Sequence, residues 1–176
     1  EMFSLTKTPN DYFIGGLSGP GYMYPSVIPP ERFKVLAKEM NSLMQRLQLR
    51  VLEIMAHTDR GVPIGYFDLT KKTVDLYYQN YPDLLGFING YAAAHTYDLR
   101  HGQAMMSYDY YLDPHRPAPD ATADLDELIH LNPRRPYFLL VHVRESNSIQ
   151  RVKGILAGLS EPVEVVPLDK FLALAA

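Results

Sequence analysis

Short apolar segments alternate with amphipathic helical segments along this chain, and no other feature of the sequence restricts its fold as strongly. The apolar segments cover residues 12–14, 50–56, 84–91, 102–109, 137–143 and 163–166. The helical segments begin near residues 30, 68, 122, 146 and 168. Strands that alternate with helices form right-handed βαβ units and a mainly parallel sheet. We therefore predict an α/β fold of about six strands in a single domain, residues 1–176.

The first helical segment has clear signals for its beginning and for its buried face. Pro30 suits a first helical turn, and Glu31 suits the positive end of the helix dipole. Apolar residues then recur at helical spacing. They are Phe33, Leu36, Ala37, Met40, Leu43, Met44 and Leu47. We expect this stripe to pack in the core.

Residues 137–143 are apolar at nearly every position. Such a run is typical of a strand that is buried on both faces of a parallel sheet. Ser146 is the expected N-cap of the helix that follows. A complete (β/α)8 barrel needs about 250 residues, and this chain has 176. The prediction is therefore an irregular or partial (β/α) barrel, with an open flavodoxin-like sheet as the alternative. In both architectures ligands bind at the carboxyl ends of the strands.

Composition excludes several classes of protein. The net charge of −3 argues against a nucleic-acid partner. With no Cys, the chain has no disulfide, no thiol nucleophile and no Cys-ligated metal. No apolar run reaches the roughly 20 residues that span a bilayer, so we expect no membrane partner. Because the chain begins with Glu1 rather than Met, we expect a fragment of a longer domain or protein, with a segment or domain missing before it.

Tyrosine is abundant, with 13 residues, and tryptophan is absent. Tyrosine combines a flat apolar ring with a polar hydroxyl, which suits binding surfaces. Six tyrosines lie in or beside segments that we expect to meet at the carboxyl ends of the strands. They are Tyr22, Tyr24, Tyr91, Tyr108, Tyr110 and Tyr111. The sequence therefore predicts a tyrosine-rich binding face there.

The loop after the first apolar segment is rich in glycine, which permits positive φ and close approach of a ligand to the backbone. Its residues 15–25 read GGLSGPGYMYP. Three interpretations are open: a backbone cradle for phosphate, a rigid loop that presents Tyr22 and Tyr24 to a ligand, or a loop that only packs its tyrosines. The Lys-Ser/Thr pair of a P-loop is absent, and Ser18 does not lie in a G-x-S-x-G elbow.

Within this loop, Gly19, Gly21, Tyr22, Tyr24 and Pro25 match every fixed position of the motif G-x-G-Y-x-Y-P. The chain therefore resembles the GxGYxYP family of putative glycoside hydrolases. The segments NDYF at residues 10–13 and VVPLDKF at residues 165–171 also resemble the C-terminal domain of that family. The resemblance implies a TIM-barrel-like fold, a carbohydrate substrate, a bacterial protein involved in polysaccharide processing, a separate N-terminal domain, and a secreted or periplasmic location. It supplies no catalytic pair, so only the five motif residues carry over.

Glycoside hydrolysis needs two carboxyl groups, about 5–5.5 Å apart in retaining enzymes and about 6.5–9.5 Å apart in inverting ones. Asp109 and Glu145 each follow a predicted strand, and we predict that they are the catalytic pair. Two structural interpretations stay open: Asp109 as a solvated loop acid, and Glu145 as the ion-pair partner of Arg144. Glu53 lies inside a predicted strand, where it either faces solvent at an edge or must be paired or protonated.

We expect further polar side chains to surround the sugar. They are His57, Asp59, Asn89 and His142. His57, Asp59, His95 and His142 could also form a metal site, but no H-x-x-x-H or H-E-x-x-H pairing occurs, so we predict no metal and no cofactor. The sequence thus predicts a carbohydrate-active domain that binds sugar at the carboxyl ends of its strands. The alternatives are a non-catalytic module that binds a glycan or a protein, and a nucleotide- or phosphate-binding α/β module.

Overall fold

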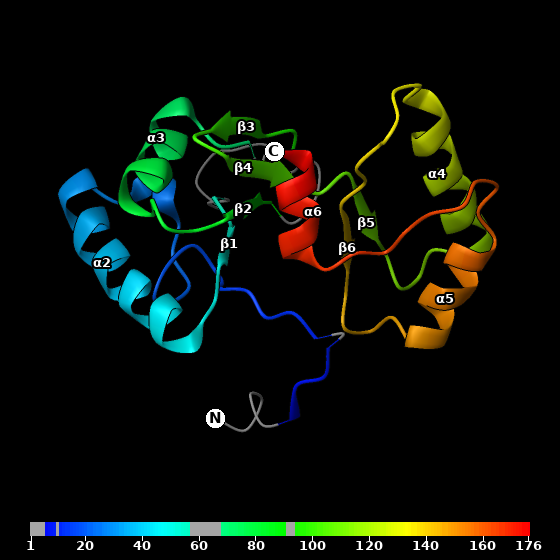
Figure 1. Ribbon diagram of the computed structural model, residues 1–176, viewed down its shortest axis with the longest axis horizontal. Coiled ribbons are helices and arrows are strands. Elements are labelled where there is room, and N and C mark those ends of the chain that lie inside the picture. The colour runs from blue at the N-terminus through cyan, green and yellow to red at the C-terminus, as the bar shows by residue number, and fades with distance from the viewer. Residues whose placement is uncertain (1–5, 10, 57–67, 91–93) are drawn as a thin grey trace.

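The strands of the protein form two separate sheets (Figure 1). The computed structural model describes residues 6–9, 11–56, 68–90 and 94–176. Sheet A has the strand order β1-β2-β4-β3, in which β1, β2 and β4 are parallel and β3 is antiparallel to β4. Sheet B pairs β5 with β6 in parallel. The strand bounds are β1 Val51–Ile54, β2 Gly86–Asn89, β3 Tyr97–Arg100, β4 Gln103–Ser107, β5 Tyr110–Leu112 and β6 Val141–Val143.

The predicted α/β class and the mainly parallel sheet are confirmed, but a six-stranded barrel is not. Sheet A has four strands and stays open, with β1 and β3 at its edges. The helices are α2 Pro30–Leu47, α3 Lys71–Asn80, α4 Ala118–Leu131, α5 Ile149–Ala157 and α6 Leu168–Ala175, with a short 3-10 turn η1 at Pro25–Val27. None of the helices in the described ranges is both long enough and apolar enough to cross a bilayer.

Helices cover both faces of sheet A. Side chains from α2 and α3 pack on one face, and side chains from α6 pack on the other. Because neighbouring residues of a strand point to opposite faces, Leu52 and Ile54 join the α2–α3 core, whereas Val51 joins the α6 core. A third core lies between sheet B and the helices α4 and α5. The chain therefore forms two lobes; it passes from the first to the second at residues 108–109, between β4 and β5, and returns between α5 and α6.

The predicted stripe of the first helix is largely confirmed. The helix begins at Pro30 and ends at Leu47, and Gln48 closes it with a φ of 56°. Its buried side chains are Phe33, Ala37, Met40 and Met44. Leu43 and Leu47 belong to the predicted stripe but are exposed. The buried face is thus narrower than the apolar stripe.

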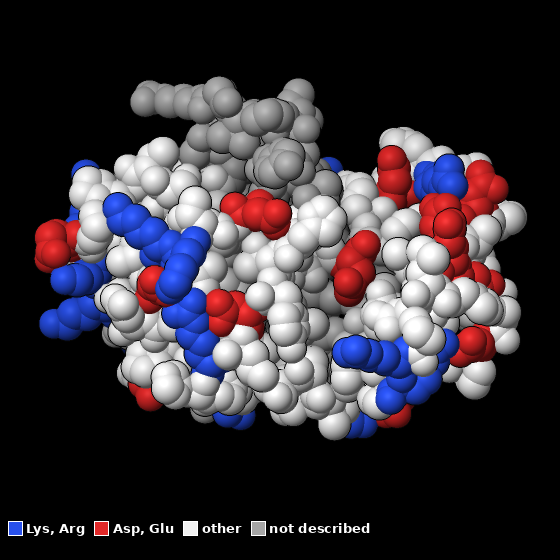
Figure 2. Space-filling view, turned by 90° about the horizontal axis from the view of Figure 1, so that it is seen from above, with Lys and Arg blue, Asp and Glu red and all other residues white. Residues whose placement is uncertain are grey.

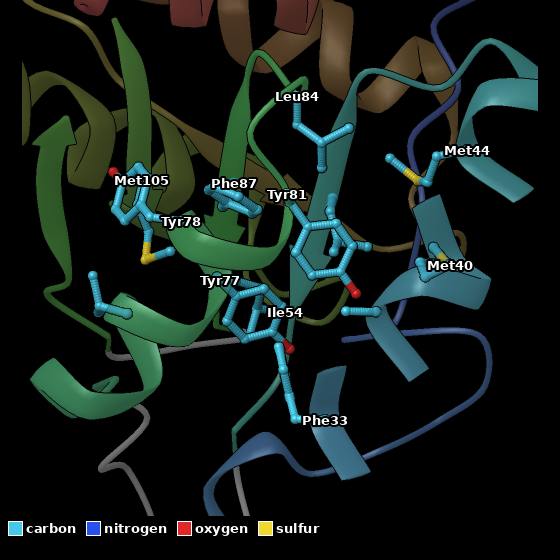
Figure 3. Close-up of a cluster of buried hydrophobic side chains, with 13 residues drawn as sticks. Phe33, Met40, Met44, Ile54, Tyr77, Tyr78, Tyr81, Leu84, Phe87 and Met105 are labelled. Atoms are coloured by element: carbon cyan, nitrogen blue, oxygen red, sulfur yellow. The ribbon is translucent and has the colours of Figure 1, made fainter. Parts of the chain in front are cut away.

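Two tyrosines form the middle of the α2–α3 core. Tyr77 of α3 and Tyr81, which caps that helix, are stacked with ring centroids 5.7 Å apart, and both are fully buried. Phe33 and Phe87 contact both of them edge-on. Figure 3 shows these rings among the aliphatic and methionine side chains. These two tyrosines therefore serve packing in the core.

The hairpin β3–β4 was not expected from the sequence. Residues 97–100 alternate between exposed and partly buried positions, because β3 is an edge strand. The strands are joined by His101 and Gly102, which both have positive φ, 51° and 78°. A two-residue turn with positive φ at both positions suits the twist of a hairpin. His-Gly is a weaker signal for such a turn than Asn-Gly, so the sequence alone did not indicate the hairpin.

The run at residues 137–143 does not form one long buried strand. Only Val141–Val143 is a strand, and it is partly exposed. Phe138 and Leu140 pack in the α6 core, whereas Leu139 and Val141 pack against α4 and α5. The run is therefore apolar on both sides because it separates two cores, not because a wide parallel sheet encloses it.

Three further predictions need correction. Residues 12–14 form no strand; beside them, Gly15 forms an isolated β-bridge with Leu52 of β1. The N-cap of α5 is Ser148, whose hydroxyl accepts the N–H of Arg151, and not Ser146. Residues 163–166 are an extended connection with no ladder partner among the described residues, and their side chains are largely exposed.

Candidate functional site at the carboxyl ends of sheet A

The glycine-rich loop is attached to the edge strand β1 by its backbone. The N–H of Gly15 donates to the carbonyl of Val51 at 2.8 Å, and the N–H of Ser18 donates to the carbonyl of Glu53 at 2.7 Å. The N–H of Glu53 donates to the carbonyl of Gly15 at 2.7 Å. Two of the N–H groups that a phosphate would need are therefore already bound to β1.

Ser18 holds the loop in place. It is fully buried, and its Oγ accepts the N–H of Met55 at 2.8 Å and donates to the carbonyl of Met55 at 3.0 Å. The hydroxyl of Tyr77 donates to the carbonyl of Ser18 at 2.8 Å. The Ser18 hydroxyl is fully used in these contacts, so it serves structure and not nucleophilic attack.

The motif loop lies beside the carboxyl end of β1, where Ser18 and Tyr22 contact Met55. A Cβ on Gly19 would lie 2.4 Å from the sulfur of Met23, so a larger residue there would require the Met23 side chain to move. Tyr22 is 60% exposed, its ring contacts Tyr24 edge-on, and its hydroxyl reaches the sulfur of Met55. Of the two tyrosines, Tyr22 therefore offers the larger surface to a ligand.

A cleft of about 390 Å³ lies where sheet A meets the second lobe. Its walls come from the segment before β3, from β3 and β4, from residues 108–109, from β5, and from α4. The lining residues are Ala94, His95, Thr96, Tyr97, Met106, Ser107, Tyr108, Asp109, Tyr110, Tyr111 and Leu128. Four tyrosines and one carboxyl group thus share a concave surface, which suits a ligand with hydroxyls and apolar ring faces.

Asp109 occupies the point where the chain passes from β4 to β5. Its Oδ2 accepts the N–H of Leu140 at 2.7 Å, and its own N–H donates to the carbonyl of Leu140 at 2.8 Å. The residue is exposed at the surface, yet desolvation by the surrounding protein raises the pKa of its carboxyl, while the N–H groups of Leu140 and Asp109 lower it. The negative charge of Asp109 in turn helps to raise the pKa of Tyr137, so this tyrosine lies close by.

Glu145 lies at the other end of sheet B. Asp109 directly precedes β5 and is held level with Leu140, whereas Glu145 follows the end of β6. Residues 140–143 alone extend roughly 10 Å at about 3.3 Å per residue. In Figure 1, β1 runs upward and β6 runs downward, so the end of β6 is on the opposite side from the end of β1. The structure therefore does not bring Glu145 into the cleft of Asp109.

The surroundings of Glu145 match the structural interpretation. Its side chain is 80% exposed and lies 3.5 Å from the guanidinium of Arg144. Its own backbone N–H and Arg144 lower the pKa of its carboxyl. Arg144 also donates to the hydroxyl of Tyr111 at 3.4 Å. Glu145 is thus a solvated, ionised partner of Arg144.

Glu53 is partly buried at the carboxyl end of β1. As a neighbour of Leu52 and Ile54, its side chain points away from the α2–α3 core, to the same side as Val51. Tyr108, directly after β4, donates its hydroxyl to Oε1 of Glu53 at 2.8 Å. Burial raises the pKa of this carboxyl, and the bond from Tyr108 lowers it in part. Of the two possibilities left open for Glu53, the structure shows the paired one.

His142 and Asn89 have separate surroundings. The His142 ring lies edge-on to Tyr108 and is stacked on Tyr111, with centroids 4.8 and 5.3 Å away. Desolvation and the nearby Arg144 lower the pKa of His142, which favours the neutral imidazole. Asn89 is fully buried at the end of β2, and its Nδ2 donates to Oγ1 of Thr96 at 2.9 Å. His142 therefore supports the tyrosines of the cleft, and Asn89 supports its Thr96 wall.

Two predicted residues, His57 and Asp59, lie outside the described residues, as does Tyr91. In the part of the chain that the structure describes, no three His, Asp or Glu side chains come together as metal ligands. Figure 2 views the molecule from the side toward which β1 runs, and its uncovered part has acidic side chains near the middle and both acidic and basic side chains toward the sides. This mixture of charges suits an uncharged ligand better than a polyanion.

Sequence reasoning missed Glu53 and Tyr137 as members of this region. The signal for Glu53 was present, because an acid between Leu52 and Ile54 faces away from their core and is either solvated or paired. Its partner Tyr108 lies 55 residues away, and no local pattern indicates that contact.

Comparison with known families gives a match over the full length of the chain. The model of a family described as GxGYxYP putative glycoside hydrolase C-terminal domain matches residues 1–176, the whole chain. Comparison with curated proteins and with solved structures gives no match.

Proposed function

We propose that this chain, which belongs to the GxGYxYP putative glycoside hydrolase C-terminal domain family, binds a carbohydrate in the cleft between sheet A and the second lobe and takes part in hydrolysis of its glycosidic bond. The observation that carries the proposal is the position of Asp109. Its carboxyl group lines the cleft together with Tyr97, Tyr108, Tyr110 and Tyr111.

The tyrosines account for binding. Tyr97 is 62% exposed and offers a ring face on which the apolar side of a sugar can stack. Tyr110 donates its hydroxyl to Asp124 at 2.7 Å, and this bond fixes its ring on the wall of the cleft. Rings held in place before binding lose little conformational entropy when the ligand arrives.

Asp109 accounts for the chemistry. A carboxylate beside the anomeric carbon can act as a base toward water or as a nucleophile. Desolvation raises the pKa of the Asp109 carboxyl, and the N–H groups of Leu140 and of Asp109 itself offset part of this rise by stabilising the charged form. The hydrogen bond to Leu140 also fixes the orientation of the carboxylate, which is the positioning that such a reaction requires.

The test uses the full chain with a panel of oligosaccharides and polysaccharides, and measures both binding by calorimetry and release of reducing ends. We expect Asp109→Asn to keep binding within a few fold and to lower the rate of hydrolysis by about 10²–10⁴-fold. Asp83→Asn is the matched control, because Asp83 is an exposed acid in the turn before β2. Tyr97→Ala should weaken binding, whereas Leu99→Ala, the next exposed position on the same side of β3, should not. A chain that binds no glycan would refute the proposal.

One observation favours a second candidate, a non-catalytic glycan-binding domain. Among the residues that line the cleft, Asp109 is the single acid, whereas hydrolysis of a glycoside ordinarily uses two. The same experiment separates the candidates. Tight binding without release of reducing ends, unchanged in Asp109→Asn, supports the binding domain.

A further inference from the structure

Glu53 has an unusual position for a carboxyl group. It lies at the carboxyl end of β1, on the side of sheet A that faces the α6 core, and it is partly buried there. On the same side of the sheet, one step nearer the amino ends of the strands, Val51 and Ala104 are fully buried and apolar. An acid that continues an apolar stripe costs stability unless it is paired or protonated, and here the hydroxyl of Tyr108 pairs with only one of its two oxygens.

The two oxygens of this carboxyl group have different environments. Oε1 accepts the hydroxyl of Tyr108 at 2.8 Å. Oε2 has no hydrogen bond within the described ranges, and a Cβ built on Gly16 would lie 3.7 Å from it, so the backbone of Gly16 is close by. Gly16 is exposed and has no side chain, so a ligand can approach Oε2 over it. Oε1 is thus held by the protein, and Oε2 is available to a ligand.

Tyr108 connects this carboxyl to the cleft. Its ring lines the cleft next to Asp109, while its hydroxyl reaches Glu53. The edge-on contact with His142 fixes the ring from another side. A saccharide bound in the cleft and extended across Tyr108 toward the glycine-rich loop would therefore contact Asp109 on one side of the ring and Glu53 on the other.

We propose that Glu53 is the second catalytic carboxyl group of the hydrolysis, that it donates a proton to the glycosidic oxygen from Oε2, and that Tyr108 is its positioning residue. This inference rests on the proposed function. As the C1–O bond breaks, its electron pair passes to the glycosidic oxygen, which takes the proton of Glu53. Water supplies the hydroxyl that ends on C1 and the proton that returns to Glu53. The partial burial of Glu53 supports this role, because burial favours the neutral acid that can donate a proton.

The experiment compares two substrates of the same sugar with the wild-type chain and with Glu53→Gln. One is a dinitrophenyl glycoside, whose leaving group needs no proton, and the other is a saccharide or alkyl glycoside, whose leaving group does. We expect Glu53→Gln to lose about 10²–10⁴-fold in kcat/KM on the second substrate and to stay near wild type on the first. Glu39→Gln, at an exposed position of α2, is the control and should match wild type on both.

Tyr108→Phe tests the positioning role. In the described part of the chain, Tyr108 is the one titratable side chain that acts on the pKa of Glu53, and its hydrogen bond lowers that pKa. Its removal should therefore move the alkaline limb of the pH–rate profile upward and lower kcat. A merely structural role would lower the rate without moving the limb.

Each outcome leads to a decision. Equal losses of Glu53→Gln on both substrates, or no loss on either, overturn the assignment of Glu53 and leave the hydrolase proposal standing. If the wild-type chain binds glycans but hydrolyses neither substrate, the hydrolase proposal itself fails and the assignment of Glu53 fails with it. Thermal unfolding of each variant confirms that the comparison is made between folded proteins.

Discussion

The two stacked tyrosines of the α2–α3 core provide a matched pair for testing how buried hydroxyls affect stability (Figure 3). Tyr77 and Tyr81 are both fully buried, and their rings are 5.7 Å apart. The hydroxyl of Tyr77 donates to the carbonyl of Ser18. The hydroxyl of Tyr81 is buried with no hydrogen-bond partner among the described residues. The substitutions Tyr77→Phe and Tyr81→Phe therefore remove the same atom from different environments.

The expected effects have opposite signs. Tyr77→Phe breaks a buried hydrogen bond and leaves the carbonyl of Ser18 without it, which costs about 2 kcal/mol of unfolding free energy. Tyr81→Phe removes a hydroxyl that lost its water and gained no bond, so it should stabilise by about 1 kcal/mol. The void left by the hydroxyl, roughly 10 Å³ at about 24 cal/mol per Å³, reduces this stabilisation by only about 0.2 kcal/mol. The two variants should thus differ by about 3 kcal/mol.

Urea unfolding followed by circular dichroism measures this difference. The slope of the unfolding free energy with urea should be the same in both variants, so that the midpoints report stability alone. For a chain of this size a difference of about 3 kcal/mol corresponds to roughly 6–12 °C in Tm. If Tyr81→Phe is destabilised as much as Tyr77→Phe, the Tyr81 hydroxyl has a partner in solution and the reasoning is wrong.

Three further predictions follow from single positions. Gly86→Ala should destabilise the protein by about 2 kcal/mol, because the new Cβ would lie 2.3 Å from the carbonyl oxygen of Ala104 on the neighbouring strand. Urea unfolding measures the loss of stability, and an unchanged midpoint would contradict the close contact. Gly154→Ala should stabilise by about 0.5–1 kcal/mol, because Gly154 lies inside α5 with open space around it; a lower Tm would disprove this. Glu53→Gln should be more stable than wild type at neutral pH. The raised pKa of Glu53 means that the folded state binds this proton more tightly than the unfolded state does. Wild type therefore loses stability as the pH rises from the ordinary carboxyl pKa through the pKa of the folded state, and the glutamine variant does not. Unfolding midpoints measured across pH should converge at low pH, and a difference that instead grows on acidification would show a lowered pKa.

The elements that are determined by local patterns were predictable. The stripe of α2, the proline at its beginning and the apolar segments of β1, β2 and β4 all have sequence signals within one element. Errors occurred where a pattern had two explanations. Residues 137–143 are apolar because they separate two cores, and a strand enclosed by one sheet has the same composition.

The candidate site was predicted in part. The motif loop lies beside the end of β1, and Asp109 lies in a tyrosine-lined cleft near the same side of the sheet. The pairing of Asp109 with Glu145 assumed that all strands run in one direction through one sheet. Sheet B is separate, and in Figure 1 its strand β6 runs downward whereas β1 runs upward, so the end of β6 is not beside the end of β1.

The sequence by itself determined the α/β class, the order of most elements, the motif and the family that carries it. These follow from the periodicity of apolar residues and from residue identity, which act over a few positions along the chain. Only the tertiary structure decided that the strands divide into two sheets and that Glu53 meets Tyr108. Contacts of this kind join residues far apart in the sequence, 55 positions in that case, and they depend on how whole elements pack against one another. The physical reason is that burial constrains each residue locally, whereas the choice of its partner depends on the packing of the complete chain.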